Sequence, residues 1–167
     1  MQQTARPQIA FRIITDDDTA FLQGLYNSTR AWEFAHTTWT PGDRAHFLEG
    51  QFMAQSRHYS LTYPRAVHRI IQLDQRDIGR LIVDRQDDCL RLIDLTLAPE
   101  QRGRGIGTDI LRSLINEAHG GKVPLRLHVE KTSPAIRLYL RHGFRATNDQ
   151  GHHFAMEWHP AMMAQAT

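Results

Sequence analysis

The sequence predicts a mixed α/β domain, and three observations support this prediction. Two segments with apolar residues at helical spacing lie early in the chain, between residues 19 and 53. Three short runs that alternate between apolar and polar residues follow between residues 67 and 97. A strand–helix–strand pattern then begins at residue 90 and ends at residue 129. The length of 167 residues predicts one domain over residues 1–167, with its core at about residues 9–158.

The first part of the chain predicts one short strand and two helices. Ile9, Phe11 and Ile13 alternate along the strand. The segment TDDD at residues 15–18 offers N-caps to a helix that carries apolar residues on one face. A second helix has Thr40 as its cap and Pro41 at its first position. The expected apolar faces comprise Phe21, Leu22, Leu25 and Tyr26 in the first helix and Ala45, Leu48, Phe52 and Met53 in the second.

The second part predicts a meander followed by a crossover. Strands are expected at residues 67–73, 78–84 and 90–97, and the short turns between them favour antiparallel pairing. A helix with apolar residues from Ile106 to Ala118 follows and ends at Gly120–Gly121. The remaining expected elements are a strand at 124–129, a helix that Ser133 caps and Gly143 ends, and a hairpin of residues 144–147 and 153–158.

Composition and charge argue against several classes of protein. The net charge is only +2, and the arginines that dominate the 20 basic residues are scattered, so no nucleic-acid partner is expected. No apolar run reaches the length of about 20 residues that spans a bilayer, and the first residues lack a signal pattern, so we expect a cytoplasmic protein without a membrane partner. Cys89 is the single cysteine, and the histidines near Glu157 lack metal-ligand spacing, so neither a disulfide nor a metal site is expected.

The segment APEQRGRGIGTD at residues 98–109 is the strongest functional motif. It places three glycines at alternate positions between an apolar strand and an amphipathic helix, and Arg102 and Arg104 lie among them. Free N–H groups and the helix dipole make such a helix start an anion site. A tight turn without a ligand is the alternative reading, but it rarely needs three glycines and two arginines.

Two other phosphate motifs fit this segment poorly. A P-loop needs Lys-Ser/Thr after its last glycine, whereas Ile106, Gly107 and Thr108 stand here. The dinucleotide fingerprint is closer, but Thr108 takes the place of its third glycine. Too little chain follows Thr108 for the rest of a doubly wound sheet, although Glu130 lies where an acidic ribose partner would be sought.

The segment LTLAPEQRGRGIGTDIL at residues 95–111 resembles the coenzyme A signature of the GNAT acyltransferase superfamily, Gln/Arg-x-x-Gly-x-Gly/Ala, over Gln101 to Gly107. The segment HVEKTSPAIRLYLRHGF at residues 128–144 resembles the second hallmark of that family, with Ala135, Leu138, Tyr139, Gly143 and Phe144 matching. Ser133, which has a shorter side chain, takes the position of the family asparagine that contacts the pantetheine arm of the coenzyme. The expected order of elements also agrees from about residue 9 to 158.

The resemblance implies a GNAT fold: a central mixed, mostly antiparallel sheet of about six or seven strands, splayed between the fourth and fifth strands, with helices on both faces. It also implies a bulge in the strand before the glycine-rich segment. Acetyl-coenzyme A would lie in the slot between residues 93–97 and 126–130. Its pyrophosphate would bind residues 102–108, which we call the glycine loop. The residues expected to bind the coenzyme are Leu95, Leu97, Gln101, Arg102, Gly103, Arg104, Gly105, Ile106, Gly107, Thr108 and Ser133.

The resemblance also implies catalytic roles. Tyr139 matches the general acid that protonates the departing thiolate, although helical spacing alone favours a core aromatic residue. Asp94 is the candidate general base because it is an acid in an apolar strand beside the slot; a structural carboxylate is an equal reading. His128 and Glu130 on the neighbouring strand are alternative bases, and some members of the family need none.

The expected activity is N-acetyl transfer from acetyl-coenzyme A, without a metal, to a primary amine of a small molecule or protein, by direct attack. Trp32, Glu33 and Phe34 are expected to line the acceptor site, where one acid among aromatic residues suits a cationic amine; core packing is an even alternative for the aromatics. A non-catalytic acyl-coenzyme A sensor and an arginine-driven nucleic-acid module are the rival functions. Since dimers are common in the family, a homodimer is one expected state.

Overall fold

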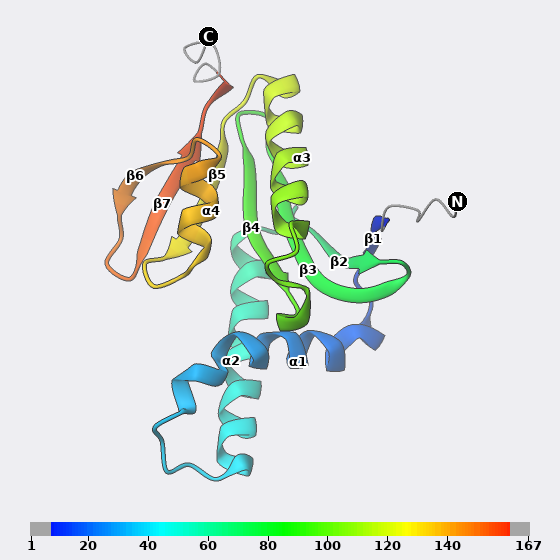
Figure 1. Cartoon of the computed structure of the whole chain (residues 1–167), viewed down its shortest axis with the longest axis vertical. Coiled ribbons are helices and arrows are strands. Elements are labelled where there is room, and N and C mark those ends of the chain that lie inside the picture. Colours follow the sequence, from blue (N-terminus) through cyan, green and yellow to red (C-terminus); the bar gives the residue numbers. More distant parts are fainter. Residues whose placement is uncertain (1–7, 161–167) are drawn as a thin grey trace, which may run out of the picture. The chain divides into compact units, whose positions relative to one another are not determined.

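The computed structural model describes residues 8–160 and confirms the mixed α/β class (Figure 1). Its helices are α1 (Thr19–Arg30), α2 (Pro41–Thr62), α3 (Ile106–Gly121) and α4 (Ala135–Arg141), with single 3₁₀ turns η1 (Asp16–Asp18), η2 (Ala31–Phe34) and η3 (Pro99–Gln101). Its strands are β1 (Ile9–Ile13), β2 (Val67–Leu73), β3 (Arg76–Arg85), β4 (Leu90–Leu97), β5 (Leu125–Glu130), β6 (Arg145–Asp149) and β7 (His153–Trp158).

The described strands form one seven-stranded sheet in the order β1-β2-β3-β4-β5-β7-β6. β1 pairs antiparallel with β2, and β7 pairs antiparallel with both β5 and β6. β4 and β5 are parallel, and α3 is the crossover that such a connection requires. The sequence therefore predicted the mixed, mostly antiparallel sheet correctly.

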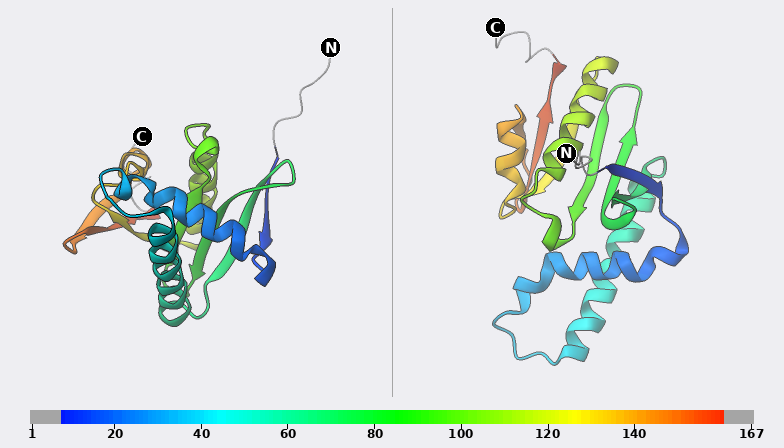
Figure 2. Two further views of the ribbon diagram at one scale, coloured as in Figure 1. Left: turned by 90° about the horizontal axis from the view of Figure 1, so that it is seen from below. Right: turned by 45° about the vertical axis from the view of Figure 1, so that its right-hand side comes forward.

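The chain divides into two units, to which β3 and β4 both contribute. The first contains residues 8–81 and 96–102 of the described chain. Its core joins α1, the η2 turn and α2 to β2 (Figure 2). The core residues are Leu22, Tyr26, Phe34, Leu48, Phe52 and Ile70.

The apolar face of α2 is narrower than the sequence predicted. Leu48 and Phe52 are buried, but Ala45 is exposed and Met53 is 63% exposed. The predicted start of this helix is confirmed, since the Asp43 backbone N–H donates to the Thr40 hydroxyl at 3.1 Å. Helical spacing therefore located the helix correctly but overestimated how many turns the core covers.

The second unit contains residues 82–95 and 103–160 of the described chain. The inner row of α3 is buried as predicted, and Leu125, Leu127 and Val129 on alternate positions of β5 are buried as well. Figures 1 and 2 show α4 beside β5 and β7 in this unit. Gly143 ends the segment after α4 at φ +86°, where an added Cβ would contact the Trp158 ring.

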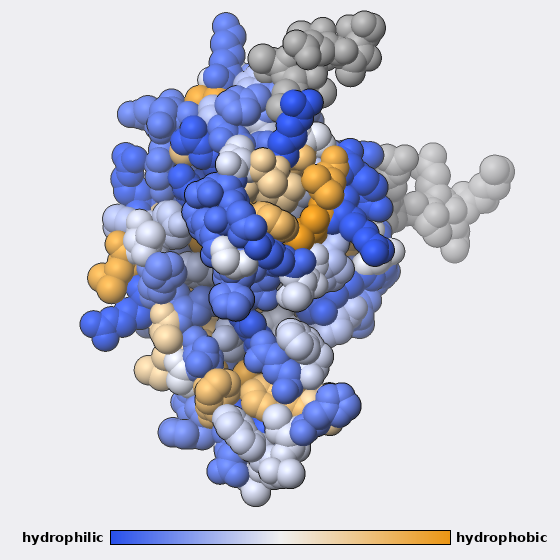
Figure 3. Space-filling model, turned by 90° about the vertical axis from the view of Figure 1, so that its left-hand side faces the viewer, coloured by the Kyte–Doolittle hydropathy of each residue, from blue (hydrophilic) through white to orange (hydrophobic). Residues whose placement is uncertain are grey.

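Neither unit contains a helix that meets the requirements of a membrane span: none of the described helices is both long and apolar enough. The molecular face in Figure 3 is mainly hydrophilic, and its apolar areas are separate from one another.

A charged network holds the first strand of the first unit to the η1 turn and to β3. The Arg12 guanidinium donates to both Asp18 oxygens at 2.9 and 2.7 Å and to Asp77 Oδ2 at 2.5 Å. Asp18 is buried, and its hydrogen bonds from Arg12 and from the Thr15 backbone lower its pKa to about 2. The same guanidinium lowers the pKa of Asp77.

We expect Asp18→Asn to lower the free energy of unfolding at pH 7 by about 2 kcal/mol, because it removes charged hydrogen bonds to Arg12. A carboxyl whose pKa is depressed in the folded state stabilises the protein above its unfolded pKa of 3.8 and loses that contribution as the pH falls toward 2. The difference between wild type and variant should therefore shrink between about pH 4 and pH 2. Urea unfolding across this range measures it, with Asp17→Asn, exposed in the same turn, as control; a pH-independent difference would contradict the prediction.

Candidate active site

β4 and β5 pair over only part of their length in the second unit. The parallel register joins Leu90–Leu92 to Leu125–Leu127, whereas β4 continues to Leu97 and β5 to Glu130. From His128 onward, β5 keeps its pairing with β7. The two strands thus separate at the position that the sequence predicted, and Asp94 and Leu95 follow directly after the last paired residue of β4.

The glycine loop forms the start of α3. Gly103 and Gly105 have φ values of +70° and +85°, which glycine adopts without steric cost. An added Cβ at either glycine would meet no atom of the described residues within 4 Å. Gly105 is the N-cap, and no side chain of residues 8–160 caps this end. The first backbone N–H groups of α3, at Ile106, Gly107 and Thr108, are therefore suited to an anion.

The end of β4 carries its own arginine contact in the first unit. The exposed Arg102 side chain donates from Nε to the Leu97 carbonyl oxygen at 2.9 Å. A carbonyl oxygen has two lone pairs, so this bond leaves one acceptor position at Leu97. Gln101 ends the η3 turn, and Arg104 is exposed at the start of the glycine loop in the second unit.

Tyr139 is buried in α4, with 8% of its surface exposed, and its ring lies 5.6 Å from that of Phe144. Burial and the negative charge of Asp94 raise the pKa of Tyr139 to about 12. Its phenol therefore keeps its proton throughout the neutral range. The effect of Asp94 also means that the two candidate catalytic residues lie close enough to interact.

His128 and Glu130 lie on the opposite face of the sheet from Asp94. Residues that pair across two strands lie on the same face of the sheet, and Leu92 pairs with the buried Leu127. Asp94 is two residues after Leu92, so it lies on that same face. His128 lies on the other face, where part of its side chain reaches solvent. Partial burial of its ring and the nearby Arg91 and His153 lower its pKa. A neutral imidazole can accept a proton, so His128 retains the chemistry of a base.

Ser133 has a structural contact at the start of α4. Its hydroxyl accepts a hydrogen bond from the Ala135 backbone N–H at 3.2 Å. Its own backbone N–H donates to the Glu130 carbonyl at 2.9 Å. The N-cap of α4 is Pro134, one residue later than predicted, and the Ser133 hydroxyl contacts the first helical residue from outside the helix. A contact of Ser133 with a coenzyme stays a prediction.

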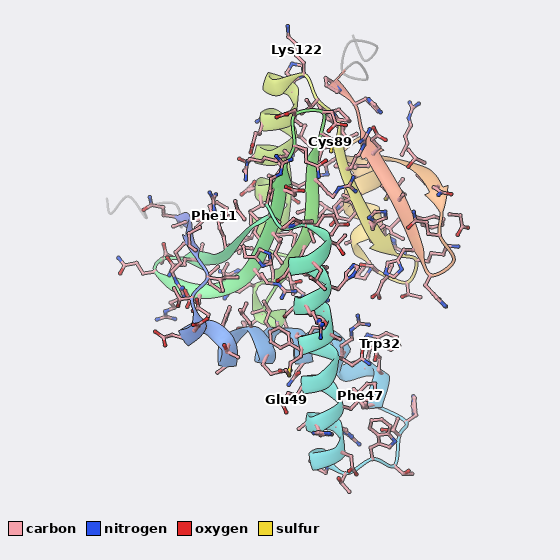
Figure 4. All side chains as sticks on the ribbon, turned by 180° about the vertical axis from the view of Figure 1, so that it is seen from behind. Phe11, Trp32, Phe47, Glu49, Cys89 and Lys122 are labelled. Atoms are coloured by element: carbon pink, nitrogen blue, oxygen red, sulfur yellow. The ribbon has the colours of Figure 1, made fainter. Side chains whose placement is uncertain are left out.

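The three residues expected to line the acceptor site differ in exposure within the first unit. Trp32 is 65% exposed on η2, where Figure 4 labels it. Glu33 accepts a hydrogen bond from Arg30 at 2.8 Å. Phe34 is buried in the core and packs against Trp39, with ring centroids 5.7 Å apart. Trp32 and Glu33 are therefore the accessible part of this group.

Comparisons with known proteins agree with this fold. Residues 64–146 match the model of the acetyltransferase (GNAT) domain, which covers both the glycine loop and α4. The chain belongs to the GNAT family. It is therefore an acyltransferase of the GNAT type, as the sequence predicted.

Solved structures of low sequence identity share the fold. The PaiA N-acetyltransferase from Thermoplasma acidophilum, in complex with coenzyme A, is 18% identical with a TM-score of 0.66 over 91% of this chain and 99% of that one. A GNAT family acetyltransferase from Elizabethkingia anophelis with acetyl-CoA bound is 14% identical with a TM-score of 0.57, covering 90% and 97%. Arabidopsis thaliana Naa50, in complex with the bisubstrate analogue CoA-Ac-MVNAL, is 13% identical with a TM-score of 0.58, covering 90% and 97%.

Two further observations concern residues outside the predicted set. No group of three or more His, Cys, Asp or Glu side chains among residues 8–160 is placed to hold a metal ion. Gly79 in β3, in contrast, makes a close approach to β4 that the sequence analysis did not anticipate. The signal was present, because a lone glycine inside a strand often marks a bulge or a close backbone approach.

Proposed function

We propose that the protein transfers an acetyl group from acetyl-coenzyme A to a primary amine, and that the coenzyme lies along β4 with its pyrophosphate at the start of α3. The observation that supports the donor best is the glycine loop. Its two left-handed glycines leave open space beside the uncapped N–H groups of a 16-residue helix. Such a helix end binds phosphate, and the structural relatives above include proteins with coenzyme A or acetyl-CoA bound.

In the proposed reaction, Asp94 and Tyr139 divide two proton transfers. The acceptor nitrogen reacts as the neutral amine, after its ammonium form has lost one proton to water, and forms a bond with the acetyl carbonyl carbon while the carbon–sulfur bond breaks. Asp94 takes the proton that the nitrogen releases, and Tyr139 gives its phenolic proton to the sulfur. A proton passed on from Asp94, directly or through water, restores the Tyr139 phenol. His128 and Glu130 are the second candidates for the base.

We propose that the acceptor is a cationic amine and that Trp32 and Glu33 contact it. An exposed indole and a carboxylate both attract positive charge. The relative in complex with CoA-Ac-MVNAL carries a peptide-derived acceptor group, so peptide N-termini belong beside small polyamines in any set of acceptors to be tested.

Calorimetry with acetyl-coenzyme A is the first test, with ATP and NADH as control ligands. We expect micromolar binding of acetyl-coenzyme A and at least tenfold weaker binding of both controls, about 1.4 kcal/mol or more. Release of free thiol with a set of polyamines and short peptides then tests the transfer. Acetyl-coenzyme A binding without thiol release from any amine would favour the non-catalytic sensor, and stronger binding of ATP or NADH would refute the proposed donor.

A further inference from the structure

Gly79 lies in the middle of β3, within the first unit, and has no room for a side chain. An added Cβ would overlap the Thr96 carbonyl oxygen and would lie 3.0 Å from Leu97 Cδ2 and 3.2 Å from Ile71 Cδ1. The leucine and isoleucine tips can rotate away, but the carbonyl belongs to the β4 backbone. Gly79 is not in the left-handed region, so glycine is needed here for space rather than for its φ angle.

The hydrogen bonds at the two ends of the β3–β4 hairpin show why the carbonyl comes so close. The Gln86 N–H donates to the Cys89 carbonyl at 3.0 Å, and the Ala98 N–H donates to the Ile78 carbonyl at 2.8 Å. Eight residues lead from Ile78 to Gln86 along β3, whereas nine lead from Cys89 to Ala98 along β4. β4 therefore contains one extra residue, which defines a β-bulge.

The bulge changes which backbone groups β3 engages. In a regular antiparallel ladder, hydrogen-bonded pairs recur at every second residue, so the Gln86–Cys89 pair would lead to a pair of Ile78 with Leu97. The extra residue moves the partner of Ile78 from Leu97 to Ala98. The Leu97 carbonyl accepts a hydrogen bond from the Arg102 side chain, a contact that lies outside the β3–β4 ladder.

We propose that Gly79 is a positioning residue for the coenzyme: its missing side chain makes room for the bulge that turns the Leu97 backbone out of the ladder and toward the pantetheine arm. This inference rests on the proposed function, in which the end of β4 binds that arm. An added methyl group at residue 79 would push Thr96 away and favour the regular register. The pyrophosphate site at Gly103–Thr108 would be unaffected, because it uses other backbone groups.

Two ligands distinguish the part of the site that binds the pantetheine arm from the part that binds the pyrophosphate. Acetyl-coenzyme A engages both, whereas adenosine 3′-phosphate 5′-diphosphate contains the pyrophosphate without the pantetheine arm. We expect Gly79→Ala to raise the Kd of acetyl-coenzyme A about tenfold or more while the Kd of adenosine 3′-phosphate 5′-diphosphate changes less than about twofold. Gly24→Ala and Gly50→Ala are matched controls, since an added Cβ at either helical glycine meets no described atom within 4 Å.

Unchanged acetyl-coenzyme A affinity in folded Gly79→Ala, or an equal loss for both ligands, would overturn the inference. Failure of wild type to bind acetyl-coenzyme A would instead overturn the proposed function. Should Gly79→Ala not fold, hydrogen exchange of the wild type decides. The Leu97 amide should then exchange more slowly with acetyl-coenzyme A than with adenosine 3′-phosphate 5′-diphosphate, and equal rates would refute the role of the bulge.

Discussion

Tyr139→Phe is expected to lower kcat by about 10²- to 10³-fold while changing the Kd of acetyl-coenzyme A less than about threefold. The magnitude is typical of a lost general acid, and the phenylalanine ring preserves the packing against Phe144. The proposed acid step requires a protonated phenol. Burial and Asp94 raise the pKa of Tyr139 to about 12, so this phenol keeps its proton at pH values where an ordinary tyrosine begins to ionise.

The raised pKa of Tyr139 predicts how kcat changes with pH in the alkaline range. Because the pKa of Tyr139 is raised, its acid form should persist through pH 10, and the turnover of wild type should not fall through loss of that proton below about pH 11. Asp94→Asn removes the nearby negative charge, so the pKa of Tyr139 should decrease and the alkaline fall in kcat should move to lower pH. Steady-state rates between pH 6 and 11 measure both changes.

The value of kcat and the Kd of acetyl-coenzyme A together distinguish a catalytic role of Tyr139 from a packing role. A packing role for Tyr139 would lower the thermal stability and weaken coenzyme binding together with kcat, whereas an acid role lowers kcat alone. Leu138→Ala on the preceding position of α4 is the control, because it changes packing without removing a phenol. Equal turnover in wild type and Tyr139→Phe would rule out the proposed acid.

Local sequence signals predicted much of this fold and part of the site. Thr40 and Gly143 act where their capping and turn chemistry indicated, since those effects depend on only a few neighbouring residues. Burial was harder to predict. Phe34 is buried and Trp32 is exposed two residues earlier on the same turn, because tertiary packing rather than spacing decides which ring enters the core.

The register of the sheet was the second limit. A period of two placed β3 and β4 correctly, but it cannot count the extra residue in β4, which only the family resemblance implied and which the hydrogen bonds at both ends of the hairpin show. The separation of β4 from β5 after Leu92 likewise came from the family resemblance and not from any local pattern. Non-local pairing therefore decided the features that matter most for the proposed site.

Gly105→Glu is expected to raise the Kd of acetyl-coenzyme A more than about 100-fold, because a side chain at this position fills the space where the phosphates approach the start of α3. The free protein has room for that side chain, since an added Cβ meets no described atom within 4 Å. Its folding cost is therefore mainly the positive φ of +85°, about 1–2 kcal/mol for a residue with a Cβ.

Gly151→Glu is the matched control. Gly151 has φ +78° and the same open surroundings, but it lies in the turn between β6 and β7 rather than at the start of a helix. The two variants should thus show similar decreases in the free energy of unfolding, whereas only Gly105→Glu should lose coenzyme affinity. Gly105→Gln distinguishes the volume of the side chain from its charge. If glutamine weakens binding as much as glutamate does, the side chain excludes the phosphates by its volume. If glutamine leaves binding unchanged, repulsion between the carboxylate and the phosphates dominates. Equal acetyl-coenzyme A affinities for Gly105→Glu and Gly151→Glu would show that the glycine loop does not hold the pyrophosphate.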